Sequence, residues 1–136
     1  MEDDRPMTDP APTTAPRVLV LDDEPIILMD LGFALEDEGA EVLDARSVAE
    51  ALELIERQTP DAAILDVNLG RGTTCAPVAL RLRELGVPFV LHTGDFDRQG
   101  ELVETLGAPV IPKPSSGPEV VRKALALIPS HAPATG

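Results

Sequence analysis

Four short polar clusters, each directly after an apolar run, hold the residues of this sequence that could do chemistry. In chain order the clusters are Asp22-Asp23-Glu24, Asp66-Val67-Asn68, Thr93-Gly94-Asp95 and Lys113-Pro114. Carboxylates that lie close together repel one another unless a cation lies among them, and Mg²⁺ prefers oxygen ligands. With the cation in place, one carboxylate can attack phosphorus while a lysine offsets the charge on the phosphoryl oxygens. The residue types therefore indicate phosphoryl transfer to an aspartate, provided that the clusters meet.

Five strand-sized apolar runs alternate with longer segments of helical pattern and would position these clusters. We expect strands at 17–21, 41–45, 61–65, 88–92 and 108–111, and helices near 25–39, 47–58, 74–85, 98–106 and 118–128. Strands that alternate with helices predict an α/β fold, in which helices cover both faces of a parallel sheet. His92 closes a buried strand, so we expect a core residue with satisfied hydrogen bonds and no chemical role. Ligands of such sheets bind beyond the carboxyl ends of the strands, so the clusters should converge on one edge.

Length and composition limit the class of protein. The 136 residues fit one domain, which we place at 17–128, and leave no room for a second, output domain. Segments 1–16 and 129–136 lack hydrophobic periodicity and are expected to be disordered tails. The formal net charge of -13 argues against binding to nucleic acid or to an anionic membrane. A single cysteine, Cys75, and the lack of an export signal or membrane span favour the cytoplasm.

The polar clusters, in this order and at the ends of these strands, resemble the receiver domain of bacterial response regulators over about 17–128. The resemblance implies a flavodoxin-like (βα)5 fold, with five parallel strands in the order 2-1-3-4-5. It also implies a signalling protein of a two-component system rather than an enzyme, whereas the sequence leaves the oligomeric state open between a monomer and a weak dimer. A histidine kinase or a histidine phosphotransfer protein would supply the phosphoryl group, and the signal would leave by protein contact or onward transfer. The sequence leaves open whether the chain is a phosphate shuttle, a phosphate sink or an allosteric regulator.

The resemblance assigns a role to each polar cluster, with Mg²⁺ as the cofactor. Asp66 would be the phosphoacceptor, and Thr93 would be the switch hydroxyl. Lys113 would pair with the phosphorylated carboxylate, and its bond to Pro114 would be cis, as is usual in the family. The expected Mg²⁺ ligands are Asp22 through water, Asp23, Asp66 and the Asn68 backbone carbonyl.

One position departs from the usual receiver pattern. Val110 stands three residues before Lys113, where receivers usually carry an aromatic ring that moves with the switch hydroxyl. Segment 88–96 (PFVLHTGDF) is instead similar to a single-domain subfamily with the motif Phe-Ala-Thr-Gly-any-Tyr, which lacks that ring. By this likeness Phe96 would report phosphorylation, and the alternative is that its ring packs beneath the fourth helix. Asp95 would either orient a hydrolytic water or serve as a solvated loop acid.

The first expected helix carries apolar residues on two faces. One set has the spacing of a face that meets the sheet: Ile27, Leu31 and Ala34. A second stripe lies on the opposite side: Ile26, Met29 and Phe33. A helix in a monomer normally exposes polar residues there, so this stripe would dock the helices of a histidine kinase or a phosphotransfer protein. The alternative is that Phe33 folds against a neighbouring loop.

Two other functions compete with the acceptance of a phosphoryl group. A phosphatase of the haloacid dehalogenase type also uses an aspartate nucleophile and Mg²⁺, but it needs a second aspartate two residues later. This chain has Asn68 at that place, which argues against the phosphatase. A receiver-like interaction module that never uses phosphate stays open, because Val110 removes the usual aromatic relay.

Overall fold

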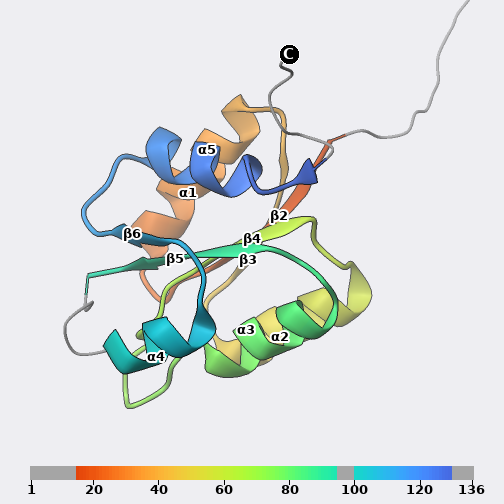
Figure 1. Cartoon of the computed structure of the whole chain (residues 1–136). Coiled ribbons are helices and arrows are strands. Elements are labelled where there is room, and N and C mark those ends of the chain that lie inside the picture. Colours follow the sequence, from red (N-terminus) through yellow and green to blue (C-terminus); the bar gives the residue numbers. More distant parts are fainter. Residues whose placement is uncertain (1–14, 95–99, 130–136) are drawn as a thin grey trace, which may run out of the picture.

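The computed structural model describes residues 15–94 and 100–129, and within them five parallel strands form a single sheet (Figure 1). The strands are β2 (Arg17–Leu21), β3 (Glu41–Ala45), β4 (Ala62–Leu65), β5 (Phe89–Thr93) and β6 (Val110–Pro112). Their spatial order is β3-β2-β4-β5-β6, so the first strand in the chain lies between the second and the third. This is the 2-1-3-4-5 order of a flavodoxin-like fold, and the expected fold class is confirmed.

Helices cover both faces of the sheet (Figure 1). They are α1 (Pro25–Asp37), α2 (Val48–Arg57), α3 (Ala76–Glu84), α4 (Gly100–Leu106) and α5 (Gly117–Leu125). α1 and α5 pack together on one face, and α2, α3 and α4 lie on the other. Serine caps begin two helices: Ser47 accepts a hydrogen bond from the Glu50 N–H, and Ser116 accepts one from the Glu119 N–H, both at 3.2 Å. No helix within the described residues is long and apolar enough to cross a membrane.

The strand β2 is buried on both sides because each face of the sheet carries its own apolar cluster. Leu19 and Leu21 belong to the cluster beneath α2, α3 and α4, whereas Val18 and Val20 belong to the cluster beneath α1 and α5. All four side chains are fully buried. Burial on both faces explains why this strand is a continuous apolar run rather than an alternating one.

The buried side of α1 differs from the set of residues that the sequence pattern indicated. Leu31 and Ala34 are buried as expected, but Ile27 is only half-buried. Leu28 and Leu35, which the expected set did not include, are buried beside them. A helix has 3.6 residues per turn, so positions 28, 31 and 35 share a face as readily as positions 27, 31 and 34. The correction moves the sheet-facing stripe by part of a turn.

Several sequence expectations fall on residues outside the described ranges. The expected tails 1–16 and 129–136 lie almost wholly there, and so does the start of the fourth expected helix. At the boundary of the first tail, the Pro16 carbonyl accepts a hydrogen bond from the Glu41 N–H at 2.8 Å. The chain is thus hydrogen-bonded to the edge strand β3 from Pro16 onward.

Candidate functional site

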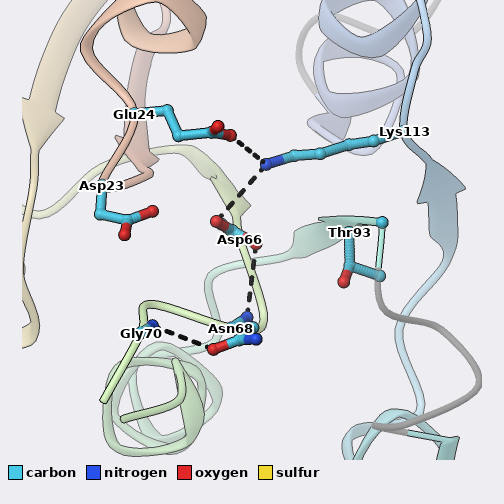
Figure 2. A pocket seen from close by; sticks show the side chains of 8 residues that line it. Asp23, Glu24, Asp66, Asn68, Gly70, Thr93 and Lys113 are labelled. Carbon is cyan, nitrogen blue, oxygen red and sulfur yellow. Dashed lines mark hydrogen bonds and ion pairs between the residues drawn. The ribbon is translucent and has the colours of Figure 1, made fainter. Parts of the chain in front are cut away.

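The described residues of the four polar clusters lie at one edge of the sheet, at or beyond the carboxyl ends of β2, β4, β5 and β6. They line an open pocket of about 420 Å³ (Figure 2). The residues that line it are Asp23, Glu24, Asp66, Asn68, Gly70, Thr93, Gly94 and Lys113. Each cluster therefore contributes at least one residue to a single pocket, at the place where parallel sheets bind their ligands.

Three aspartates gather at this edge. Asp22, Asp23 and Asp66 each offer a carboxylate oxygen, and these oxygens all lie within 4.8 Å of one another. Asp22 and Asp66 are buried, whereas Asp23 is exposed. Burial and then the charge of Asp22 raise the pKa of Asp66 from 3.8 to about 7, and burial also raises the pKa of Asp22. A divalent cation among these oxygens would offset that repulsion, so the donor set fits a hard ion such as Mg²⁺.

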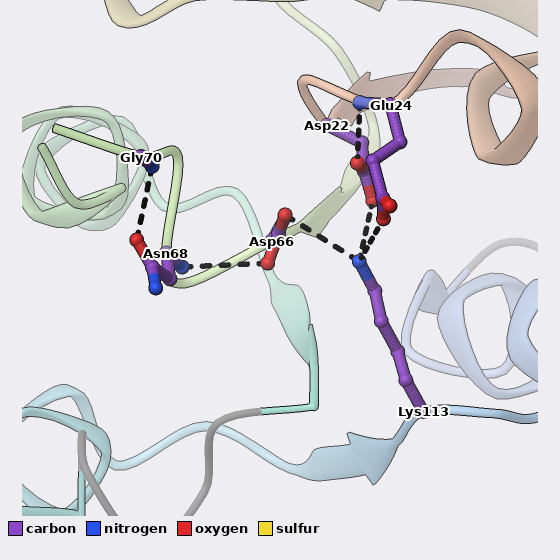
Figure 3. Close-up of polar contacts among 6 residues, drawn as sticks. All are labelled: Asp22, Glu24, Asp66, Asn68, Gly70 and Lys113. Carbon is purple, nitrogen blue, oxygen red and sulfur yellow. Dashed lines mark hydrogen bonds and ion pairs between the residues drawn. The ribbon is translucent and has the colours of Figure 1, made fainter.

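Lys113 joins the carboxylates through its ammonium group. The Nζ atom lies 3.1 Å from Asp22 Oδ2, 3.3 Å from Glu24 Oε1 and 3.4 Å from Asp66 Oδ2. Figure 3 shows Asp66 on one side of the ammonium and Asp22 and Glu24 on the other. Burial alone lowers the pKa of Lys113, but the neighbouring Asp66, Asp22 and Glu24 raise it by more, so the net shift is upward. The lysine is therefore held in its charged form beside Asp66.

Glu24 is a member of this site to which sequence reasoning gave no role. Its side chain is 60% exposed, yet it contacts the largely buried Lys113. The available signal was its place as the third consecutive acid after β2, directly behind Asp22 and Asp23. Nothing in that run shows that the partner of Glu24 would be Lys113.

The loop after β4 is fixed by hydrogen bonds from its own backbone. The Asn68 N–H donates to Asp66 Oδ1 at 3.3 Å, and the Gly70 N–H donates to Asn68 Oδ1 at 2.9 Å. Gly70 has a φ of +85°, a conformation that L side chains rarely adopt. A Cβ at this glycine would lie 3.6 Å from Asp23 Oδ2, so the loop passes close to the acidic cluster.

Thr93 ends β5 and is almost fully buried in the pocket wall. Its carbonyl accepts a hydrogen bond from the Lys113 N–H at 3.0 Å, which ties the end of β5 to the end of β6. Gly94 lies against the same lysine, since a Cβ there would be 3.6 Å from Lys113 Cβ. The peptide bond between Lys113 and Pro114 is cis, as the resemblance implied.

The remaining residue of the third cluster, Asp95, and three further candidate residues have different outcomes. Asp95 and Phe96 lie outside the described residues. Val110 begins β6 and packs, half-buried, against the apolar cluster beneath α2, α3 and α4. His92 is buried as expected, but neither ring nitrogen has a hydrogen-bond partner within the described part of the chain. The expectation of a satisfied histidine is therefore wrong, and burial lowers the pKa of His92 to about 4.

The second apolar stripe of α1 lies on the surface, outside the pocket. Ile26, Met29 and Phe33 are 71%, 53% and 63% exposed. The exposure of Phe33 contradicts the alternative in which its ring folds against a loop. Met29 and Phe33 line a groove together with Glu36 of α1 and with Val42 and Asp44 of the edge strand β3. The stripe is therefore an exposed apolar surface, as the sequence pattern predicted.

Comparison with known proteins gives a consistent family. A family model described as the response regulator receiver domain matches residues 18–124. The alginate biosynthesis transcriptional regulatory protein AlgB of Pseudomonas putida is 33% identical over 113 residues, which cover 81% of this chain and 25% of that protein. This chain thus spans about a quarter of the length of that curated relative.

Solved structures with the same fold include two bacterial proteins. SdrG from Sphingomonas melonis Fr1 is 36% identical, with a TM-score of 0.69, over 85% of this chain and 98% of that one. The chemotaxis protein CheY4 of Vibrio cholerae is 26% identical, with a TM-score of 0.71, over 85% of this chain and 99% of that one. Because the family model also covers most of the sequence, the chain belongs to the response regulator receiver domains of two-component systems.

Proposed function

We propose that this chain accepts a phosphoryl group on Asp66, in a Mg²⁺-dependent step, from a histidine kinase or a histidine phosphotransfer protein. The observation that carries the proposal is the placement of Asp66. Its carboxylate lies within 4.8 Å of those of two further aspartates and 3.4 Å from the Lys113 ammonium. Asp66 thus has both a candidate cation site and a fixed positive charge beside it. Phosphoryl transfer requires such groups, because negative charge is spread over the phosphoryl oxygens in its transition state.

The contacts of Asp66 prepare its carboxylate for attack. The Asn68 N–H contacts Oδ1 and the Lys113 ammonium contacts Oδ2, so the carboxylate is held from two directions. In the transfer, a carboxylate oxygen would form a bond to phosphorus in line with the breaking bond to the donor's imidazole nitrogen, and the imidazole would leave with the bonding electrons. Bound Mg²⁺ would reduce the repulsion between the carboxylate and the phosphoryl oxygens. The residues proposed to hold the ion are Asp22 through water, Asp23, Asp66 and the Asn68 backbone carbonyl.

Thr93 is the proposed switch residue. It lines the same pocket as Asp66, so its hydroxyl would donate a hydrogen bond to a phosphoryl oxygen. A movement of Thr93 would displace the chain at the end of β6, because the Thr93 carbonyl accepts a hydrogen bond from the Lys113 N–H. Gly94 has no side chain to cover this side of the pocket, which leaves the phosphoryl group open to a partner or to water.

The exposed stripe of Ile26, Met29 and Phe33 is the proposed docking surface for the kinase or phosphotransfer protein. α1 begins directly after Glu24, a pocket residue, so the stripe starts beside the pocket mouth. The groove that Met29 and Phe33 share with β3 also has the side chains of Glu36 and Asp44 in its lining, so it would accept a partner side chain with an apolar stem and a basic end. A helix docked there would carry its phosphohistidine toward Asp66.

The proposed phosphoacceptor is tested by incubation with acetyl phosphate and Mg²⁺, followed by intact-mass measurement. Wild type should gain one phosphoryl group, and chelation of the metal should abolish the gain. Asp66→Asn should gain none, whereas Asp37→Asn, which alters an exposed carboxylate at the end of α1, should behave as wild type. A gain that survives in Asp66→Asn would show that another residue is phosphorylated and would refute the assignment.

A further inference from the structure

Glu24 lies at the mouth of the pocket with its carboxylate turned toward Lys113 (Figures 2 and 3). Its Oε1 is 3.3 Å from Lys113 Nζ, and its side chain is 60% exposed. Two further described carboxylates contact the same ammonium, those of Asp22 and Asp66, and their side chains are only 2% and 6% exposed. Among the described residues, Glu24 is therefore the outermost of the three carboxylates that contact Lys113.

The structure of α1 does not explain this side-chain direction. Glu24 occupies the N-cap of the helix, where a side-chain oxygen often accepts a backbone N–H, but it makes no capping bond. Its own N–H donates to Asp22 Oδ1 at 2.9 Å, and its carbonyl accepts the Leu28 N–H at 3.1 Å. The backbone of Glu24 is thus held by its neighbours, and its carboxylate is directed to Lys113 instead of to the helix.

We propose that Glu24 is a specificity residue of the phosphoacceptor pocket, which selects against small phosphodonors that carry high negative charge. A donor brings negative charge toward Asp66 and needs Lys113 for its phosphoryl oxygens. Glu24 opposes both, because it shares the lysine and adds a negative charge at the entrance. This inference rests on the proposed transfer of a phosphoryl group to Asp66.

A protein donor can overcome this barrier in a way that a small anion cannot. Ile26, the first residue of the docking stripe, follows Glu24 by two positions, so a partner on the stripe also lies near Glu24. A basic side chain of that partner would pair with Glu24 and leave Lys113 free for the phosphoryl oxygens. The chain has 24 acidic and 11 basic residues, so a partner surface with basic side chains is also electrostatically favoured.

The test compares wild type with Glu24→Gln, which keeps the size of the side chain and removes its charge. Two donors are used at saturating Mg²⁺, and intact mass is followed over time. With acetyl phosphate the bond from phosphorus to oxygen breaks and acetate leaves as the bond to Asp66 forms. With phosphoramidate, which carries less negative charge, the bond from phosphorus to nitrogen breaks and ammonia leaves. The substitution should raise the initial rate with acetyl phosphate about three- to tenfold at low ionic strength, and less with phosphoramidate.

Three controls separate a local effect of the Glu24 charge from other causes. Glu53→Gln removes a similarly exposed carboxylate, 63% exposed and paired with Arg57 on α2, and should leave both rates unchanged. Calorimetric titration with Mg²⁺ should show equal or slightly weaker binding by Glu24→Gln, which would exclude better metal loading as the source of a faster rate. The gain should also shrink toward unity in about 0.5 M salt, where charges at exposed sites are screened.

Three results would overturn the specificity role of Glu24: an unchanged rate in Glu24→Gln, an equal gain in Glu53→Gln, or an equal gain with both donors. Failure of the proposed function looks different. In that case neither wild type nor Glu24→Gln would gain a phosphoryl group on Asp66 from either donor. The role of Glu24 would then fall together with the function on which it rests.

Discussion

Replacement of Asp66 by Asn should make the metal-free protein more stable at alkaline pH. Burial and the charge of Asp22 raise the pKa of Asp66 from 3.8 to about 7. The folded protein therefore holds this proton more tightly than the unfolded chain, and the resulting stability is complete below about pH 4 and lost as the pH rises through 7. Over roughly three pKa units the loss is at most about 4 kcal/mol. Because Asn does not ionise, the free energy of unfolding of Asp66→Asn should exceed that of wild type by about 1 to 4 kcal/mol at pH 8. Near pH 4 the two free energies should be almost equal.

Urea unfolding followed by circular dichroism suits this measurement, because the chain contains no Trp or Tyr. The free energy of unfolding is measured at pH 8 and pH 4 in EDTA, and again at pH 8 with Mg²⁺. A ligand that binds only the folded state stabilises it, so Mg²⁺ should stabilise wild type more than Asp66→Asn. Asp37→Asn at the end of α1 is the matched control and should show no such effects. The reasoning is refuted if Asp66→Asn is no more stable than wild type at pH 8, or if its advantage is the same at pH 4.

Three further changes should have separable effects. Gly70→Ala forces a side chain into a φ of +85° beside Asp23, so it should cost about 1 kcal/mol of unfolding free energy and weaken Mg²⁺ binding in calorimetry; unchanged affinity would contradict a role for this turn. Met29→Ser combined with Phe33→Ser should slow phosphotransfer from a histidine kinase and spare the reaction with acetyl phosphate, whereas equal loss with both donors would indicate misfolding. Burial lowers the pKa of His92 from 6.5 to about 4. As the pH falls from 6.5 to 4, the imidazole is therefore protonated in the unfolded chain before it is protonated in the folded one, and the folded state loses stability. His92→Phe should remove this loss, and an identical change in unfolding free energy between pH 7 and pH 5 in both proteins would count against it.

The strands could be predicted from sequence because buried parallel strands are short, continuous apolar runs. Their ends depend on backbone groups that such a run does not show. The fourth strand was expected at 88–92, but Pro88 has no N–H to donate, and β5 begins at Phe89 and continues to Thr93. Pro88 still accepts the Ala63 N–H through its carbonyl at 3.1 Å. The strand is therefore displaced by one residue, and Thr93, which was expected directly after the strand, is its last residue and still lines the pocket.

His92 illustrates what the position of a residue in a strand cannot reveal. Its burial was predictable, because the run that ends at this residue is apolar. Side chains alternate along a strand, so His92 faces the same side as Val90, which packs in the apolar cluster beneath α1 and α5. That cluster consists of aliphatic side chains, which explains why the imidazole nitrogens find no partner among the described residues. The composition of the facing layer arises from segments that are distant in the sequence.

The sequence predicted which residues meet at the polar edge of the sheet. It did not predict which of their side chains form ion pairs. Asp22, Asp66 and Lys113 each follow a strand, and parallel strands end at a common edge. The contact between Glu24 and Lys113 joins residues 89 positions apart, and it depends on the length of the lysine side chain and on the register that sets Thr93 opposite Pro112. The Lys113 ammonium thus contacts three carboxylates within the described part of the chain. A bound cation or a basic side chain of a partner would neutralise one of these carboxylates. The attraction between Lys113 and Asp66 would then change, because fewer carboxylates would compete for the ammonium.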